Sequence, residues 1–466
     1  MSGNHNHTAA DTLRKDPEVK KELRKHLGTD NYTNFLYIGR AYLVAILAIV
    51  GAICFFEYQQ AAGYSAWWNL PILLISMILV GGTQHQFAGA GHEAVHHTLF
   101  KNRTLNEAAS DLLCMFPIMT STYQFRLYHL AHHQFVNDPD RDPDFSLLKD
   151  SGHWMEFPVK KRHFIMMMIR QLLLADLVRY IIARIKYNTV GTHDKSPYRM
   201  STDQKGIIPS RLGVGMFIFL VVSLIVNQKY GSPLQLVIMN VSAWLVVASI
   251  LATLAERFFD KARIKPVYHP RFLFIAQTGF YTALLSTLGY VQMTTELMAL
   301  RYFSVLWYLP MATTFPFFMI LRQVIQHGNG DRGWLTNTRV FRMNALVRYT
   351  VFPFGMDYHL PHHMYATVPH YRLKDLHEFL MTKEPYSDNC QLVDNYIIPD
   401  NNEHRNPTVV EVLGPDYACE DEEVHIDDTV LDDWDVEEKD QILKAGRPSK
   451  PAPKPAAPGP SFEVPS

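Results

Sequence analysis

The chain has 466 residues, and its 44 lysines and arginines almost balance its 45 aspartates and glutamates, which gives a formal net charge of −1. This balance excludes the strongly basic surface typical of nucleic-acid binding, so we expect no nucleic-acid partner. The four scattered cysteines provide neither a disulfide framework nor a cysteine-ligated zinc site, whereas the 22 histidines are an unusual number.

The chain opens with a polar segment, residues 1–35, that lacks the pattern of a signal peptide, so we expect no cleaved leader. Apolar runs follow, and several are long enough to cross a bilayer core of about 30 Å as helices, the first with Arg40 reaching to the membrane interface. They are residues 36–56, 66–88, 212–228, 232–255, 272–292 and 302–321. We therefore predict an all-α, multi-pass integral membrane protein.

Residues 159–187 are also apolar, but charged side chains between Arg170 and Lys186 interrupt the run. Charges at this density are costly in hydrocarbon, which disfavours a membrane span. We predict an amphipathic helix at the membrane interface. A helix in a soluble core is the alternative.

The orientation of the spans follows from the lysines and arginines, which are concentrated in residues 1–35, 141–211 and 256–271. With six spans, these three segments fall on one side of the membrane, and the positive-inside rule assigns that side to the cytoplasm. The histidine clusters described below fall on the same side. We therefore expect them to face the cytoplasm.

The apolar pattern stops after about residue 385. Residues 416–440 are strongly acidic, and residues 446–466 are rich in proline, alanine and glycine. Such a composition buries too little apolar surface to offset the entropy that is lost on ordering. We predict a polar cytosolic N-terminus at 1–35, a membrane domain at 36–385 and a disordered tail at 386–466.

Histidines gather in three clusters outside the apolar runs. On a helix, residues i, i+3 and i+4 lie on one face, so the three imidazoles of an HxxHH sequence can converge. In the first cluster, His92 and His96 share a face, while His97 is turned away from His92 by about 140°. The clusters are His92-Glu93-Ala94-Val95-His96-His97, His129-Leu130-Ala131-His132-His133 and His359-Leu360-Pro361-His362-His363.

A single histidine, His327, follows the last apolar run and completes a set of nine converging side chains. Nine exceed the four to six ligands that surround one metal ion, but they suit two ions. His97 is a candidate for an additional ligand, and we interpret His85 as structural. The predicted metal ligands are His92, His96, His129, His132, His133, His327, His359, His362 and His363.

The ordered HxxxHH, HxxHH and HxxHH boxes resemble those of the membrane fatty acid desaturase and hydroxylase superfamily. The surrounding sequences HEAVHHTLFKN, YHLAHHQFVNDPDRDPD and DYHLPHHMYATVPHYRLKDLH resemble it as well. The resemblance covers residues 36–382. The motifs are specific for the superfamily and weak indicators of the substrate.

The resemblance implies a non-haem di-iron centre in a cytosolic helical cap, with O₂ as co-substrate and an acyl chain in a buried tunnel. His327 matches in placement the extra ligand between the last span and the third box. The family core is often described with four spans, so we predict four to six, with one pair re-entrant or peripheral. The sequence has no His-Pro-Gly-Gly segment of a fused cytochrome b5. We therefore expect a separate electron donor of the ferredoxin or cytochrome b5 type.

Iron suits this chemistry because, unlike zinc, it can exchange electrons. A metal-bound imidazole usually donates its second ring N–H to a carboxylate or a carbonyl oxygen. Acidic residues within or beside the boxes are candidates for this role, and for the acidic run a solvated loop is the alternative. They are Glu93, Asp357 and the run Asp138, Asp140, Asp142 and Asp144.

We expect an O₂-dependent oxidoreductase that introduces a double bond into a fatty acyl chain. A hydroxylase or ketolase of the same superfamily, acting on a fatty acid, sphingolipid, alkane or carotenoid, is the main alternative. An intramembrane zinc protease is a distant one, since His92 to His96 has the H-E-x-x-H spacing. It leaves two clusters unexplained. A metal transporter is disfavoured because transport sites lie near the middle of the bilayer.

Overall fold

The computed structural model describes residues 8–189, 198, 207–259, 262, 264–399, 405–417 and 424–426. Within these ranges the chain is almost entirely helical, which confirms the predicted fold class. Two short strands, β1 (Val340–Arg342) and β2 (Leu392–Asp394), pair in parallel, with Val340 opposite Leu392. Residues 418–423 and 427–466, which make up most of the predicted tail, lie outside the described residues.

Six helices are long and apolar enough to cross a membrane, and each contains nearly all of one predicted span. Their outward faces carry exposed aliphatic side chains such as those of Leu47, Ile225 and Leu234, which suit contact with hydrocarbon. The six are α3 (Thr33–Ala61), η1 with α4 (Ala66–Val95), α10 (Ile207–Tyr230), α11 (Pro233–Thr253), α12 (Pro270–Thr294) and the segmented helix Ala299–His327.

The last span is broken into segments. Pro310 and Pro316 cannot donate a backbone hydrogen bond to the preceding turn, and Thr313 between them leaves the helical conformation (φ −132°, ψ −81°). The segments are α13 (Ala299–Phe303), η7 (Ser304–Tyr308), α14 (Leu309–Ala312) and α15 (Thr314–His327).

The central helix of the fold is α4, which packs against α3, α15 and α6. Its second half is buried almost without interruption from Val80 to Val95. Glycine permits this close packing, since a Cβ atom at Gly91 would lie 2.1 Å from the sulfur of Met115. The burial of this half brings the first histidine cluster into the interior.

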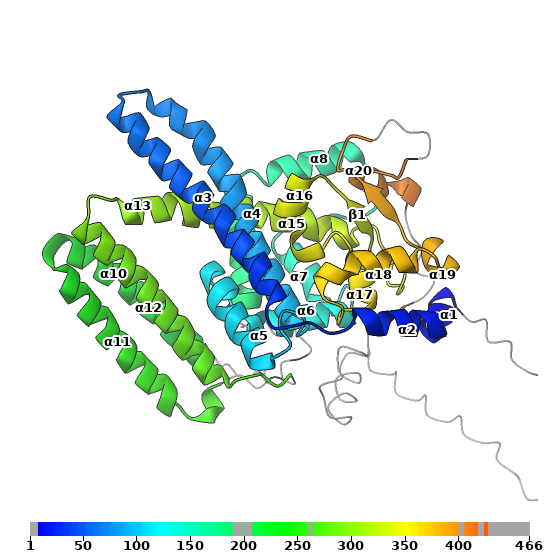
Figure 1. Cartoon of the computed structure of the whole chain (residues 1–466), viewed down its shortest axis with the longest axis horizontal. Helices are drawn as coiled ribbons and strands as arrows, with labels where there is room; N and C mark the ends of the chain where they lie inside the picture. Colours follow the sequence, from blue (N-terminus) through cyan, green and yellow to red (C-terminus); the bar gives the residue numbers. More distant parts are fainter. Residues whose placement is uncertain are drawn as a thin grey trace, which may run out of the picture.

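The remaining helices form a cap on one side of the spans, while the α3–α4 hairpin and the α10–α12 bundle project away from it (Figure 1). In sequence order the cap elements are α1 (Ala9–Lys15), α2 (Pro17–His26), α5 (Arg103–Ser110), η2 (Asp111–Met115), η3 (Phe116–Ile118), α6 (Thr122–Gln134), α7 (Pro143–Asp150), α16 (Ala345–Thr350), η8 (Pro353–Gly355), α17 (His359–Met364), η9 (His370–Arg372), α18 (Leu373–Leu380) and α19 (Glu384–Ser387). Short turns η6 (Glu256–Phe258) and η10 (Pro415–Tyr417) lie in the connections.

The amphipathic segment forms two helices, α8 (Lys161–Arg170) and α9 (Leu174–Arg184), followed by the turn η4 (Ile185–Thr189), where the sequence predicted one continuous helix. Residues 171–173 separate α8 from α9, and the last of them, Leu173, has an extended backbone. Across this break, Arg170 pairs with Asp176 (Nε–Oδ2 2.9 Å). The charges that interrupt the apolar run thus partly neutralise one another, and Leu172 and Leu174 remain exposed.

The folded body extends beyond residue 385, which corrects the predicted start of the tail. Residues 409–413 form α20 (Val409–Val412) and the residue after it, and their four aliphatic side chains are buried. The backbone N–H of Val159 donates to the carbonyl of Leu413 (2.7 Å). Asn329, two residues after His327, donates to the carbonyl of Val412 (2.9 Å). The acidic composition that follows conceals this short apolar stretch in the sequence.

Ending the chain at residue 399 should lower the Tm, because it removes four buried aliphatic side chains, each worth about 1.5–3 kcal/mol when fully buried. A chain that ends at residue 426 keeps every described contact of this region and serves as the control. Thermal unfolding in detergent compares the two. Equal Tm values would contradict the placement of residues 405–417 in the folded body.

Candidate metal centre

The first pair of histidines lies at the buried C-terminal end of α4. His92 is 2% exposed, and the helix ends at Val95, directly before His96. The buried guanidinium of Arg126, from α6, donates to the backbone carbonyl oxygens of Ala94 and Val95 in this last turn (2.9 and 3.1 Å). Arg126 also pairs with Glu107 (2.6 Å). A buried ion pair therefore fixes the helix end that carries His92 and His96.

The other histidines come from three further elements. His129, His132 and His133 lie on α6, whose residues are all buried. His359, His362 and His363 lie on α17, and His327 is the last residue of α15. In each HxxHH cluster the i, i+3 and i+4 spacing places the three rings on one side of the helix, although one ring of each cluster joins a different group from the other two.

All nine predicted ligand histidines meet in two groups. Within each group, one ring nitrogen from every histidine lies within 4.8 Å of the others. The first group contains His92, His96, His129, His133 and His362, and the second contains His132, His327, His359 and His363. The first group combines histidines from the end of α4, α6 and α17, and the second combines histidines from α6, α15 and α17.

The nitrogen spacings fit ligands that share an ion. Nε2 of His359 lies 3.0 Å from Nε2 of both His327 and His363, and Nε2 of His129 lies 3.1 Å from Nε2 of His96. Imidazole nitrogens bind first-row metal ions at about 2.0–2.1 Å, which places neighbouring ligands about 2.9–3.4 Å apart at right or tetrahedral angles.

Hydrogen bonds between the rings cannot account for these approaches. The Nδ1–H of His327 donates to the carbonyl oxygen of Asn337 (3.0 Å), so its Nε2 carries a lone pair in the neutral ring. The Nε2 of His359 has one hydrogen at most, but it faces both His327 and His363. A cation bound between these Nε2 atoms would accept the lone pair of each ring.

Burial keeps most of the rings neutral. It lowers the pKa of His129, His133 and His363 well below the usual value, and neutral imidazole is the form that binds metal ions. Burial also lowers the pKa of His132, but the carboxylates of Asp142 and Asp144 outweigh it and raise that pKa to about 9. The same negative charges would stabilise a cation bound at Nε2 of His132.

Two of the carboxylates predicted to support the ligands, those of Asp142 and Asp144, lie beside the ring of His132. Nδ1 of His132 donates to Oδ1 of Asp142 (2.9 Å), which fixes the tautomer that leaves Nε2 for a metal ion. Asp144 is farther away, with Oδ2 3.8 Å from the same nitrogen. Asp138 instead pairs with Arg141 and Arg332.

The other two predicted supporting carboxylates, those of Glu93 and Asp357, form no hydrogen bond to a predicted ligand histidine among the described residues. The carboxylate of Glu93 lies 3.8 Å from Nδ1 of His92 and accepts hydrogen bonds from Thr98 and from the backbone of His370 (both 3.0 Å). Asp357 pairs with Arg348 (2.8 Å), and among the described residues it makes no contact with a ligand histidine. Its position next to the third cluster in the sequence therefore misled the prediction, because its side chain points to a different partner.

Sequence reasoning missed several residues that hold the site. The carbonyl of Asn337, which orients His327, carries no sequence signal because every residue has one. Gln323 donates to Oδ1 of Asp144 (2.9 Å) and accepts from the hydroxyl of Tyr180. The spacing of Gln323 and His327, one turn apart on α15, was the available signal.

His97 and His85 stay outside both groups. His97 follows the end of α4 with a positive φ of 58°, so the chain turns away at this point. His85 is fully buried, and its Nδ1 lies 2.7 Å from the carbonyl of Thr350. This contact agrees with its interpretation as a structural residue.

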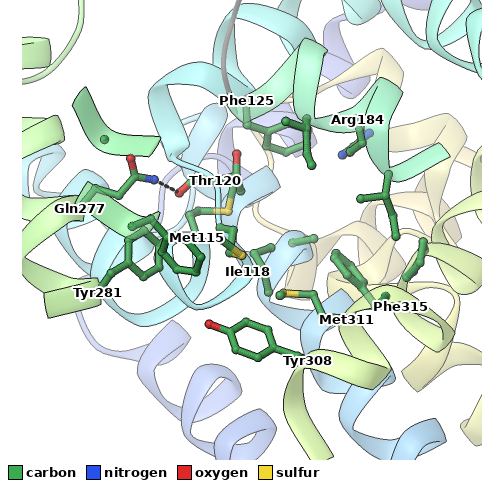
Figure 2. Close-up of a pocket in the computed structure, with 18 of the residues that line it drawn as sticks. Met115, Ile118, Thr120, Phe125, Arg184, Gln277, Tyr281, Tyr308, Met311 and Phe315 are labelled. Atoms are coloured by element: carbon green, nitrogen blue, oxygen red, sulfur yellow. Dashed lines mark hydrogen bonds between the residues drawn. The ribbon is translucent and has the colours of Figure 1, made fainter. Parts of the chain in front are cut away.

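A cavity of about 520 Å³, lined mainly by apolar side chains, lies next to the histidines. Phe125 lines it and stacks on His129, with ring centroids 5.3 Å apart. Figure 2 shows Phe125 and Arg184 close together on one side of the cavity and Tyr308 on the other. The volume is in the range of small-molecule sites, about 300–1,000 Å³. One wall of this cavity thus borders the first histidine group.

The fatty acid desaturase family model matches residues 65–260 and 225–389. A dihydrorhizobitoxine desaturase of Bradyrhizobium elkanii is 28% identical over 148 residues, which are 32% of this chain and 38% of that protein. The delta(5) fatty acid desaturase fat-4 of Caenorhabditis elegans is 35% identical over 107 residues, 23% of this chain and 22% of that protein. The chain thus matches well under half the length of each relative.

Replacing His96 by alanine should remove at least one metal ion per chain, because its Nε2 lies within the first group. Replacing the adjacent His97 by alanine should leave the metal content unchanged. Elemental analysis of the two purified variants measures the difference. Equal metal loss in both variants would contradict the structure, in which His96 belongs to the first group and His97 to neither group.

Replacing Asp142 by asparagine should weaken metal binding by about 10- to 100-fold, the usual effect of losing such a supporting contact. The exposed Asp140 (Asp140→Asn) is the matched control, and it should bind metal as the unmodified chain does. Competition with a chelator measures the affinities. An unchanged affinity in the Asp142 variant would contradict its role in orienting His132.

Proposed function

The chain belongs to the fatty acid desaturase family and is an oxidoreductase of the integral membrane class, and from this premise we propose that it uses O₂ to introduce a double bond into a fatty acyl chain. The observation that carries the proposal is the convergence of nine histidines in two groups beside an apolar cavity.

We propose that each histidine group holds one iron ion. Bound iron would supply the electron exchange and O₂ binding that removal of hydrogen from an unactivated carbon chain requires. His92, His96, His129, His133 and His362 would hold one ion, and His132, His327, His359 and His363 the other. Asp142 and the carbonyl of Asn337 orient His132 and His327, one ring each, within the second group.

The cavity is the proposed site of the acyl chain. Its walls include Met115, Ile118, Met311 and Phe315, whose side chains are apolar. Since errors of about 1 Å in substrate placement can cost a reaction about 100-fold, rigid apolar walls would select the carbons that react. The stacking of Phe125 on His129 links the cavity wall directly to a ligand.

The same contacts support a desaturase over the zinc protease. A protease would use Glu93 as a general base at an ion held by His92 and His96. In the structure, the carboxylate of Glu93 already accepts hydrogen bonds from Thr98 and from the backbone of His370. His92 and His96 also share their group with three histidines that a protease would not need.

The remaining partners follow from the chemistry and the charge pattern. We propose that the histidine groups face the cytoplasm, because with six spans the sequence order assigns the lysine- and arginine-rich stretches to the same side as the histidine clusters. A lipid or acyl substrate would enter from the membrane, and O₂ would be the oxidant. A separate protein of the ferredoxin or cytochrome b5 type would supply electrons.

Expression in a host of known lipid composition tests the function. The account predicts fatty acids that are lighter by two hydrogens, detected by mass spectrometry of the total lipid. Single alanine replacements of His132 and His362, one from each group, should abolish the product while the protein still reaches the membrane. A gain of one oxygen atom would instead identify a hydroxylase, and normal product from either variant would contradict the ligand assignment.

A further inference from the structure

Arg322 is a buried cation within the last span. It lies on α15 and is 8% exposed. Phe315 and Met319, which line the cavity, precede it by seven and three residues and therefore share its helix face. Arg322 thus continues the cavity-lining face of α15 by one turn, toward the end of the helix that carries His327.

The guanidinium of Arg322 makes no hydrogen bond or ion pair in the described part of the chain, and its Nε atom is buried without an acceptor. The negative charge of Asp144 acts on it from a distance. Oδ1 of that carboxylate already accepts hydrogen bonds from Tyr128 and from Gln323 (2.9 Å). A buried charge is costly unless an opposite charge or acceptors compensate it.

A second cation, Arg184, lines the cavity itself. It lies on α9, with its guanidinium carbon 5.7 Å from the centre of the Phe125 ring (Figure 2). None of the described lining residues carries a carboxylate. An otherwise apolar cavity therefore has a positive side next to the histidine groups.

Arg322 also lies close to the histidines along its helix. It precedes His327, a member of the second group, by five residues on α15, which is about one and a half turns. An anion bound by Arg322 would therefore lie near the end of α15 that carries His327.

We propose that Arg322, together with Arg184, binds the carboxylate of an acidic substrate whose apolar chain lies in the cavity. Guanidinium groups match carboxylates with two parallel hydrogen bonds, and such bonds are strong where water is excluded. The inference rests on the proposed function only in taking the cavity as the place of the acyl chain. It specifies the substrate as a free acid, since an ester or thioester has no carboxylate at this end.

Binding of octanoate and of octanamide, its neutral analogue of equal length, tests the proposal. The metal-loaded full-length chain in neutral lipid nanodiscs is titrated calorimetrically without O₂ or reductant, so that no turnover occurs. Octanoate should bind at least about tenfold more tightly than octanamide, the effect of one charge-assisted hydrogen bond. Acetate should bind much more weakly than octanoate, because it lacks the apolar chain.

The Arg322→Met variant should lose this preference for octanoate while binding octanamide as before. Arg301→Met, at an exposed arginine near the start of the same span, is the matched control and should retain it. Equal affinity of the unmodified chain for octanoate and octanamide overturns the proposal without any variant. Equal affinity for acetate and octanoate also overturns it, because the site would then take a small anion.

These measurements separate the inference from the proposed function. If the chain desaturates lipids in the expression host but does not prefer octanoate, the proposed carboxylate site at Arg322 is contradicted and the desaturase function is supported. If octanoate binds as expected but no desaturated product forms, the carboxylate site is supported and the proposed reaction is contradicted.

Discussion

Lone pairs of converging imidazoles repel one another unless a positive charge lies between them. Nine such rings meet inside this protein, most of them held neutral by burial, and some of their nitrogens approach to 3.0 Å. Their burial is therefore tolerable only if cations complete the arrangement. Much of the surrounding structure serves this condition, because the rings come from four separate elements that must meet with ångström precision.

The contacts that support the histidines hold the ends of their helices and the ring nitrogens that face away from the two groups. Arg126 fixes the last turn of α4 through its carbonyl groups, and close packing at Gly91 brings this helix against Met115. Asp142 fixes the orientation of His132, while a backbone carbonyl does so for His327. The fold thus combines a polar, charge-balanced centre with a neighbouring apolar cavity, as oxidation of a lipid chain would require.

Helical periodicity made much of this arrangement predictable. The HxxHH spacing predicted that the three rings of a cluster lie on one side of their helix, and the rotation of about 100° per residue separated His96 from His97. It did not predict that one ring of each HxxHH cluster joins a different group from the other two. Contacts between distant segments were not predictable. The sequence gives no sign that Asp357 pairs with Arg348 while Asp142 contacts His132. Nor does it show that residues 409–413 pack beside the loop after His327, because a strongly acidic segment follows them.

The metal content of the purified full-length chain tests the central claim most directly. Elemental analysis of protein produced with ample iron should find two iron ions per chain, one for each histidine group. A single ion per chain, or zinc in place of iron, would contradict the account, because the two groups would then not form a redox-active pair.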